Sequence, residues 1–249
     1  MRPNKMAAKF MISTSTIRNY EAKGLIPPAE RSANGYRIYT NKHAAYLSCI
    51  RAMIPAFGME VTSEVIRCLQ QDKPQDALWI IREKEVALYK EKQKLERLIQ
   101  DIRIYNIENK SPYAESTFSM NEASELTQAS KSAIRYWDEA GYVRADRNPN
   151  NRYRQYSGSH LLKIRLIQML QSSVYSEETV LFKQSISAAK PTDLQAIMKV
   201  AENIRSYLDK IIESQMCGIS FLHQLIQLTK ASRLGGASII QPYLNGPDN

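Results

Sequence analysis

Residues 13–39 read STSTIRNYEAKGLIPPAERSANGYRIY, and residues 130–156 read SKSAIRYWDEAGYVRADRNPNNRYRQY. The second stretch repeats the first in altered form, 117 positions later. The matched pairs include Ile17 and Ile134, Arg37 and Arg154, Tyr39 and Tyr156, and Ile50 and Ile167. Two copies of a unit this long indicate two like domains in one chain, not a solenoid of short repeats.

Composition agrees with two domains and shows an uneven placement of charge. The chain has 249 residues, enough for two domains that each bury a core. Its formal net charge is +9; residues 1–58 hold nine cationic and two acidic residues, and residues 120–170 hold eight and five. Basic charge on both repeated segments is typical of nucleic-acid binding. Solvated surface charge, the alternative, has no reason to concentrate in both copies.

Several classes of protein are disfavoured by what the sequence contains. Cys49, Cys68 and Cys217 share no ligand-like spacing, so we expect buried free thiols and neither a metal site nor disulfides. There are three His, no phosphate-cradling Gly loop and no paired carboxylates outside solvated helix faces, so we expect no enzyme and no cofactor. Without a signal core or a membrane-length apolar run, we expect a soluble cytoplasmic protein with no membrane partner.

The first copy opens with a pattern typical of a helix-turn-helix. Residues 6–12 suit a short helix, Ser13 is a helix N-cap, and Gly24 stops a second helix over residues 14–22. The second helix of such a motif lies in the DNA major groove with its early residues nearest the bases. The residues predicted to face the groove are Ser15, Thr16, Arg18 and Asn19.

A small β wing follows the two helices. Asn34-Gly35 is favoured at a two-residue hairpin turn, and the residues after it alternate between two faces. We expect Arg37 and Tyr39 to share the outer face and hold a phosphate, while Tyr36 and Ile38 pack inward. Helical spacing resumes over residues 42–53, and Thr62 is the predicted cap of another helix over residues 61–70.

The runs TIRNYEAKGLI, NGYRIY and IRAMIPAFGM together resemble the winged-helix head of the mercury-resistance regulator (MerR) family, over residues 6–70. The resemblance implies that Arg18 and Tyr20 lie at the DNA surface and that Arg37 and Tyr39 grip the DNA backbone. One departure is Pro55, expected to break a stretch that usually lacks proline.

The second copy keeps the same pattern with more departures. Ser130 caps its recognition helix, Trp137 stands where the family has Tyr, and Arg152 replaces the wing Gly. The residues predicted to contact DNA are Lys131, Ser132, Arg135, Tyr136, Trp137, Arg152, Arg154 and Tyr156. The two heads are therefore expected to read different half-sites.

Each head is followed by a long amphipathic helix that needs a partner helix, because its apolar seam is too long for a small head to cover. The expected fold is mainly α, with two winged helix-turn-helix heads, small β wings and two long helices paired as an antiparallel coiled coil. The predicted divisions are a first head at 1–70, a long helix at 71–107, a linker at 108–119, a second head at 120–188, a long helix at 189–230 and a tail at 231–249.

The resemblance implies a MerR-type transcription regulator bound to double-stranded promoter DNA, with RNA polymerase at the promoter as a candidate partner. We expect a monomer that imitates the family's dimer, a pseudo-dimer on an operator with two half-sites. Metal-sensing members of the family use cysteines near the start of the long helix and in a short loop after it. Metal sensing is disfavoured here, because this sequence has no cysteine around Ala77 or just beyond Asn106, and Cys217 lies inside the second long helix. A small organic effector stays open. A DNA-bending architectural or recombination-accessory protein is the alternative.

Overall fold

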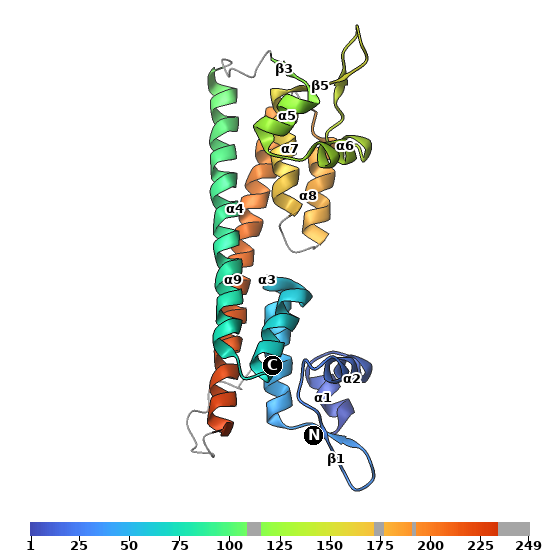
Figure 1. Cartoon of the computed structure of the whole chain (residues 1–249), viewed down its shortest axis with the longest axis vertical. Coiled ribbons are helices and arrows are strands. Elements are labelled where there is room, and N and C mark those ends of the chain that lie inside the picture. Colours follow the sequence, from blue (N-terminus) through green and yellow to red (C-terminus); the bar gives the residue numbers. More distant parts are fainter. Residues whose placement is uncertain (109–115, 172–176, 191–192, 234–249) are drawn as a thin grey trace. The chain divides into compact units, whose positions relative to one another are not determined.

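The structure is a computed structural model that describes residues 1–108, 116–171, 177–190 and 193–233 (Figure 1). It is mainly helical and contains two compact units, each with a helix-turn-helix head and a small β-sheet. Unit 1 comprises Met1–Glu83 and, from its second segment, residues 213–233; unit 2 lies within Lys84–Ile212. Most of the predicted linker and tail falls outside the described residues. No helix among the described residues is long and apolar enough to span a membrane.

The helix-turn-helix of unit 1 consists of α1 (Pro3–Lys9) and α2 (Thr14–Ala22). The α2 bounds match the prediction, and the Ser13 hydroxyl accepts a hydrogen bond from the Thr16 N–H at 2.9 Å as an N-cap. Helix α1 ends before the predicted residue 12, because Met11 adopts a left-handed conformation with φ 50°. That residue makes the turn between the helices.

The wing of unit 1 is formed by β1 (Glu30–Arg31) and β2 (Arg37–Ile38), paired antiparallel. The Ser32 N–H donates to the Tyr36 carbonyl, and the Gly35 N–H donates to the Ser32 carbonyl, each at 2.8 Å. This is a three-residue loop with Gly35 at φ 78°, so the predicted two-residue turn is wrong by one residue. Asn34-Gly35 still marks the reversal.

Helix α3 (Asn41–Gln70) follows the wing and has one interruption. The helix continues through Pro55 and breaks at Gly58, which has φ 74° and ψ 169°. Pro55 removes one backbone donor without ending the helix, whereas Gly58 tolerates a left-handed φ. The Thr62 hydroxyl donates to the Gly58 carbonyl at 2.6 Å. Thr62 therefore lies inside the second part of the helix, and its predicted role as an N-cap is wrong.

The core of unit 1 joins the first head to parts of both long helices, α4 (Pro74–Glu108) and α9 (Leu194–Arg233). Its buried members include Met6, Ile17, Ile50, Ile66, Ala77, Ile81, Leu222, Leu225 and Ile226. A Cβ on Gly218 of α9 would lie 3.3 Å from the Ala52 carbonyl oxygen and from Met53 Cα. The absence of a side chain at Gly218 lets α9 approach the α3 backbone closely.

Unit 2 contains the second head, built from three short strands and four helices. They are β3 (Thr117–Phe118), α5 (Met120–Thr127), α6 (Lys131–Glu139), β4 (Asp146–Arg147), β5 (Arg154–Ser157), α7 (Gly158–Gln171) and α8 (Glu177–Ala188). The sheet order is β3-β5-β4, with Phe118 opposite Tyr156. The first head repeats this pairing without a formal strand, because the Tyr39 N–H donates to the Met1 carbonyl at 2.9 Å. The amino terminus therefore occupies the place of β3.

The core of unit 2 packs the second head against the long helices. In this unit α4 and α9 lie side by side and run in opposite directions (Figure 1). Buried members of the shared core include Leu95, Ile99 and Ile102 of α4, Ile197, Ala201 and Ile204 of α9, and Ile164 and Ile167 of α7. The predicted pairing of the long helices is confirmed. Each helix covers the apolar seam of the other.

Candidate nucleic-acid interface

Helices α2 and α6 each bury one face and expose the other. Ile17 and Ile134, which are equivalent in the two copies, are fully buried and anchor the helices on their heads. The exposed face carries Arg18 in the first copy and Arg135 in the second. Among the described residues, neither guanidinium has a carboxylate within ion-pair distance, so both are free to bind an anionic ligand.

The turn before each recognition helix is held in the same way in both heads. Met11 and Gln128, at the same position of the repeat, have φ 50° and 58°. Left-handed non-glycine residues are uncommon and need support from surrounding structure. Arg51 Nη1 donates to the Phe10 carbonyl, and Gln168 Nε2 donates to the Gln128 carbonyl at 3.3 Å. The helix after each wing thus fixes the turn.

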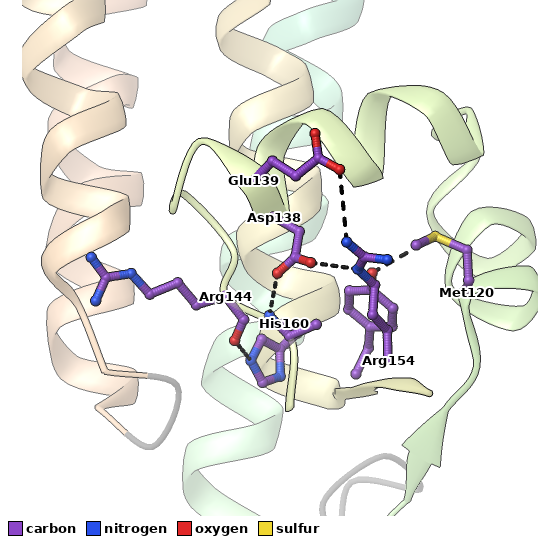
Figure 2. Close-up of polar contacts among 8 residues, drawn as sticks. Met120, Asp138, Glu139, Arg144, Arg154 and His160 are labelled. Carbon is purple, nitrogen blue, oxygen red and sulfur yellow. Dashed lines mark hydrogen bonds and ion pairs between the residues drawn. The ribbon is translucent and has the colours of Figure 1, made fainter. Parts of the chain in front are cut away.

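An ion pair links each recognition helix to its wing. Arg37 Nε donates to Glu21 Oε2 at 2.7 Å, and Arg154 Nε donates to Asp138 Oδ2 at 2.5 Å (Figure 2). Although burial opposes it, hydrogen bonds from the Ala29 N–H and from Arg37 hold the pKa of Glu21 below its usual value. The hydrogen bond to Asp138 raises the pKa of Arg154. These arginines position the wing and are partly neutralised by their partners.

A buried histidine at the start of the helix after each wing accepts a hydrogen bond from the wing backbone. The Thr40 N–H donates to His43 Nδ1, and the Ser157 N–H donates to His160 Nδ1, each at 3.0 Å. Each ring meets a tyrosine edge to face, with centroids 5.3 Å apart for Tyr39 and 6.2 Å apart for Tyr156. Burial lowers the pKa of both histidines, so they remain neutral and accept these hydrogen bonds at neutral pH. Neither ring is part of an exposed surface.

Three aromatic residues predicted to contact DNA belong to the core. Tyr39, Trp137 and Tyr156 are 1%, 2% and 0% exposed. Conversely, Tyr36 is 70% exposed and Ile38 is 39% exposed, so their predicted inward packing is wrong. The strand alternation was correct, but its two faces were reversed. The backbone of Tyr39 pairs with Met1 and its ring packs on His43, which turns this face inward.

The other predicted contact residues of both copies keep exposed or partly exposed positions. Ser15, Asn19, Lys131, Ser132, Tyr136 and Arg152 are exposed, and Thr16 and Tyr20 are partly buried. Burial raises the pKa of Tyr20, whose side chain packs against the core of the first head. Ser15 and Thr16 lie in the first turn of α2, and Lys131 and Ser132 lie in the first turn of α6. Backbone N–H groups at these helix N-termini favour anions.

A groove in the second head gathers several of these side chains. It has a volume of about 610 Å³ and lies between α6, the wing and the start of α5. Its cationic lining consists of Arg135, Arg147, Arg152 and Arg154. Arg152 has φ 63° and occupies the repeat position of Gly35, so this wing adopts the left-handed turn with a cationic residue. The arrangement suits a polyanion more than an apolar ligand.

Exposed wing residues were missed as candidate contacts. Tyr36 and Tyr153 are 70% and 74% exposed and occupy the same repeat position. Arg31 and Arg147 occupy equivalent places in the wing pairs, opposite Arg37 and Arg154. The recurrence of a tyrosine at one position of both copies was the available signal. The prediction that Tyr36 packs inward left this position out of the candidate contacts.

Comparison with known families decides the identity of the two heads. Residues 2–39 match the model described as MerR family regulatory protein, and residues 118–180 match the model described as MerR HTH family regulatory protein. The chain carries two MerR domains. The internal repeat predicted two like domains, and the resemblance predicted their family.

Curated relatives match the chain over part of its length. It is 36% identical over 78 residues to the HTH-type transcriptional regulator CueR of Salmonella typhi, which covers 31% of this chain and 56% of the relative. It is 27% identical over 118 residues to the mercuric resistance operon regulatory protein of Bacillus cereus, covering 45% of this chain and 89% of the relative. The chain thus spans about half the length of the CueR relative. No solved structure matches it significantly.

The described residues contain no cluster of three or more His, Cys, Asp or Glu that could hold a metal ion. The three cysteines are free, but only Cys49 is buried, whereas Cys68 is partly exposed and Cys217 is exposed. The expectation that all three thiols are buried is therefore wrong. Burial raises the pKa of the Cys49 thiol to about 12, which leaves it protonated and unreactive.

Proposed function

We propose that this protein is a DNA-binding transcription regulator that acts as a single-chain pseudo-dimer on an operator with two half-sites. Both heads present an exposed arginine on the recognition helix, Arg18 or Arg135, and both carry net positive charge. MerR family regulators bind promoter DNA, and MerR transcription regulators are not enzymes. Exposed donors near the start of a groove-binding helix are the groups that read base edges.

The observation that carries the pseudo-dimer is the contact between Lys92 of α4 and Asp209 of α9. Lys92 Nζ lies 3.5 Å from Asp209 Oδ1, and the two residues are 117 positions apart, so they occupy the same position of the repeat. Equivalent positions of two copies meet only where a twofold axis passes between them. In a homodimer of single repeats this position would face itself and place two like charges together. The lysine and aspartate here form a complementary pair.

The exposed pair itself contributes little stability, because its side chains are 48% and 55% exposed. The pair is informative about geometry, because it shows where α4 and α9 cross and that they are related as two helices of a dimer would be. Joining the two copies covalently removes the requirement that both heads be identical. Asn19 on α2 is matched by Tyr136 on α6, which is 62% exposed. Asparagine can donate and accept at adenine, whereas tyrosine presents a ring, so we infer two unlike half-sites.

Footprinting and stoichiometry test the proposal together. One chain should protect two half-sites on a promoter fragment, and titration against duplex at concentrations far above Kd should break at one chain per duplex. A break at two chains per duplex would exclude the single-chain dimer. A chain that binds no DNA at all would exclude the proposed role as a DNA-binding regulator.

Cross-linking tests the pairing of the helices without DNA. A Lys92→Cys, Asp209→Cys variant, with Cys68 and Cys217 replaced by Ser, is treated with a short bis-maleimide at low protein concentration. The expected product is an internally linked monomer with altered mobility on a denaturing gel. The matched control carries only Lys92→Cys and should show no internal link. A covalent dimer from the double variant would show that α4 pairs with α9 of a second chain.

A further inference from the structure

The two heads differ strongly in charge although they share one fold. Residues 1–39 hold seven cationic and two acidic side chains, whereas the equivalent residues 118–156 hold six cationic and five acidic ones. The windows are equally long and lie exactly one repeat apart, so the comparison is position by position. The net charge is +5 for the first window and +1 for the second. Sequence-independent DNA affinity depends on how many phosphates a surface neutralises.

One part of the difference lies at the helix before the recognition helix. Arg2 and Lys5, exposed at the start of α1, are matched by Ser119 and Glu122 at the start of α5. Lys5 and Glu122 occupy the same repeat position, so the charge there is reversed. In a helix-turn-helix the first helix crosses the DNA backbone, which makes this position a place for a phosphate contact.

The structure holds Glu122 within the groove that contains Arg135. Both residues line the same groove of the second head. Glu122 Oε2 accepts a hydrogen bond from the Ser119 N–H at 2.7 Å, and the Ser119 hydroxyl caps the Glu122 N–H at 3.4 Å. The backbone hydrogen bond lowers the pKa of Glu122, so its carboxylate is ionised at neutral pH. A fixed negative charge therefore lies in the same groove as the cationic residues that are proposed to bind DNA.

Other carboxylates reduce the available charge of the second wing. Arg154 contacts two carboxylates, Asp138 at 2.5 Å and Glu139 at 3.8 Å (Figure 2). Within the described part of the chain, Arg37 forms an ion pair with one carboxylate, that of Glu21. Arg152 supplies a cation where the first head has Gly35, which offsets this loss only in part. The second head thus combines several arginines with nearby carboxylates that compete with phosphate for them.

We propose that the first head supplies most of the sequence-independent affinity for duplex DNA, and that the second head binds weakly and engages its half-site only once the first is bound. This inference rests on the proposed function. Tethering makes a weak second head sufficient, because binding of the first head raises its effective concentration at the neighbouring site. The half-site under the first head would then set the affinity and the orientation of the chain on the operator. The half-site under the second head would set the discrimination between operators.

Matched charge variants of the full chain test this division. Binding to a mixed-sequence duplex of about 30 base pairs, roughly three helical turns, is followed by fluorescence anisotropy over a range of salt concentrations. Lys5→Glu should weaken binding about tenfold and reduce the magnitude of the salt slope by about 1, since each phosphate contact contributes about 0.9. Glu122→Gln keeps the capping hydrogen bond and removes the charge, so it should strengthen binding several-fold.

Two controls separate charge from folding and location. Lys90→Glu on the exposed surface of α4 makes the same charge change as Lys5→Glu and should alter binding much less. Lys131→Glu makes the same charge change on the second recognition helix. It should weaken binding to the duplex clearly less than Lys5→Glu does. Circular dichroism melting verifies that each variant is folded.

The outcomes distinguish the inference from the function on which it rests. Equal effects of Lys5→Glu and Lys131→Glu, or an unchanged affinity for Glu122→Gln, would overturn the division between heads while leaving DNA binding intact. A wild-type chain that binds no duplex at any salt concentration would overturn the proposed function itself.

Discussion

Arg154 Nε lies 2.5 Å from Asp138 Oδ2, so the second wing is fastened directly to its recognition helix. The first head repeats the contact between Arg37 and Glu21 at 2.7 Å. In each case a carboxylate near the end of the recognition helix meets an arginine at the start of the returning strand. The sequence pattern suggested that these arginines grip DNA, and the structure gives them a positioning role as well.

The first prediction concerns the Glu21 and Arg37 pair. Arg37→Ala should destabilise the first head by about 1 to 3 kcal/mol, because it leaves a largely buried carboxylate without its charged partner. The double variant Glu21→Ala, Arg37→Ala should cost less than the sum of the single changes. Urea denaturation of the four proteins in the cycle measures the coupling. Strictly additive effects would show that the contact does not stabilise the wing.

The second prediction concerns Arg18 and Arg135, which have no such partner among the described residues. Each change to Ala should weaken binding to the operator by about 1 to 3 kcal/mol if the side chain reads bases, with little effect on stability. Arg37→Ala should instead weaken binding to all sequences alike. Electrophoretic mobility shifts on operator and scrambled duplexes compare the two. Equal losses on both duplexes for Arg18→Ala would assign it to the backbone.

The third prediction is a loss of stability on mild acidification. Burial lowers the pKa of His43 and His160, so the unfolded chain binds protons before the folded heads do. Their contribution to stability is therefore full above the ordinary value of 6.5 and declines as pH falls below it towards the folded-state pKa. Thermal melting from about pH 7.5 to 5.5 should show a falling midpoint.

Glutamine variants provide the check on this assignment. Gln can fill the third helical position of a capping box, so His43→Gln and His160→Gln retain the acceptor but remove the titration. The double variant should show a flatter pH dependence over the same interval. His223→Gln, at an exposed site on α9, is the matched control and should behave like wild type. An unchanged slope in the double variant would assign the effect to other groups.

The fourth prediction concerns the contact of α9 with α3 at Gly218. Gly218→Leu should destabilise unit 1 by about 1 to 3 kcal/mol, because its side chain would overlap the α3 backbone and Phe57. Gly218→Ala should be nearly neutral, since contacts of 3.3 Å need only small shifts and alanine favours the helix by about 1 kcal/mol. Differential scanning calorimetry compares both with wild type. A fully tolerated leucine would mean that α9 is not held closely against α3.

Prediction from the sequence worked where the signal was local or repeated. The Ser13 cap, the α2 bounds and the hairpin at Asn34-Gly35 depend on neighbouring residues alone. The prediction did less well for Tyr39, Trp137 and Tyr156, because the choice of inner face depends on distant segments. The Tyr39 backbone pairs with Met1, 38 positions away, and the Tyr156 hydroxyl meets the Met120 sulfur at 3.7 Å. A family motif marks such residues as important. It does not say whether they touch a ligand themselves or pack behind residues that touch it.

The duplication, the helix-turn-helix of each copy and the two long amphipathic helices were determined by the sequence alone, because capping, turn preference and apolar periodicity are short-range properties. The tertiary structure decided which residues the heads expose and which partner each long helix takes. Burial and register result from contacts between segments far apart in the chain. The meeting of Lys92 with Asp209 is of this kind, since only the packing of α4 against α9 places two equivalent positions face to face.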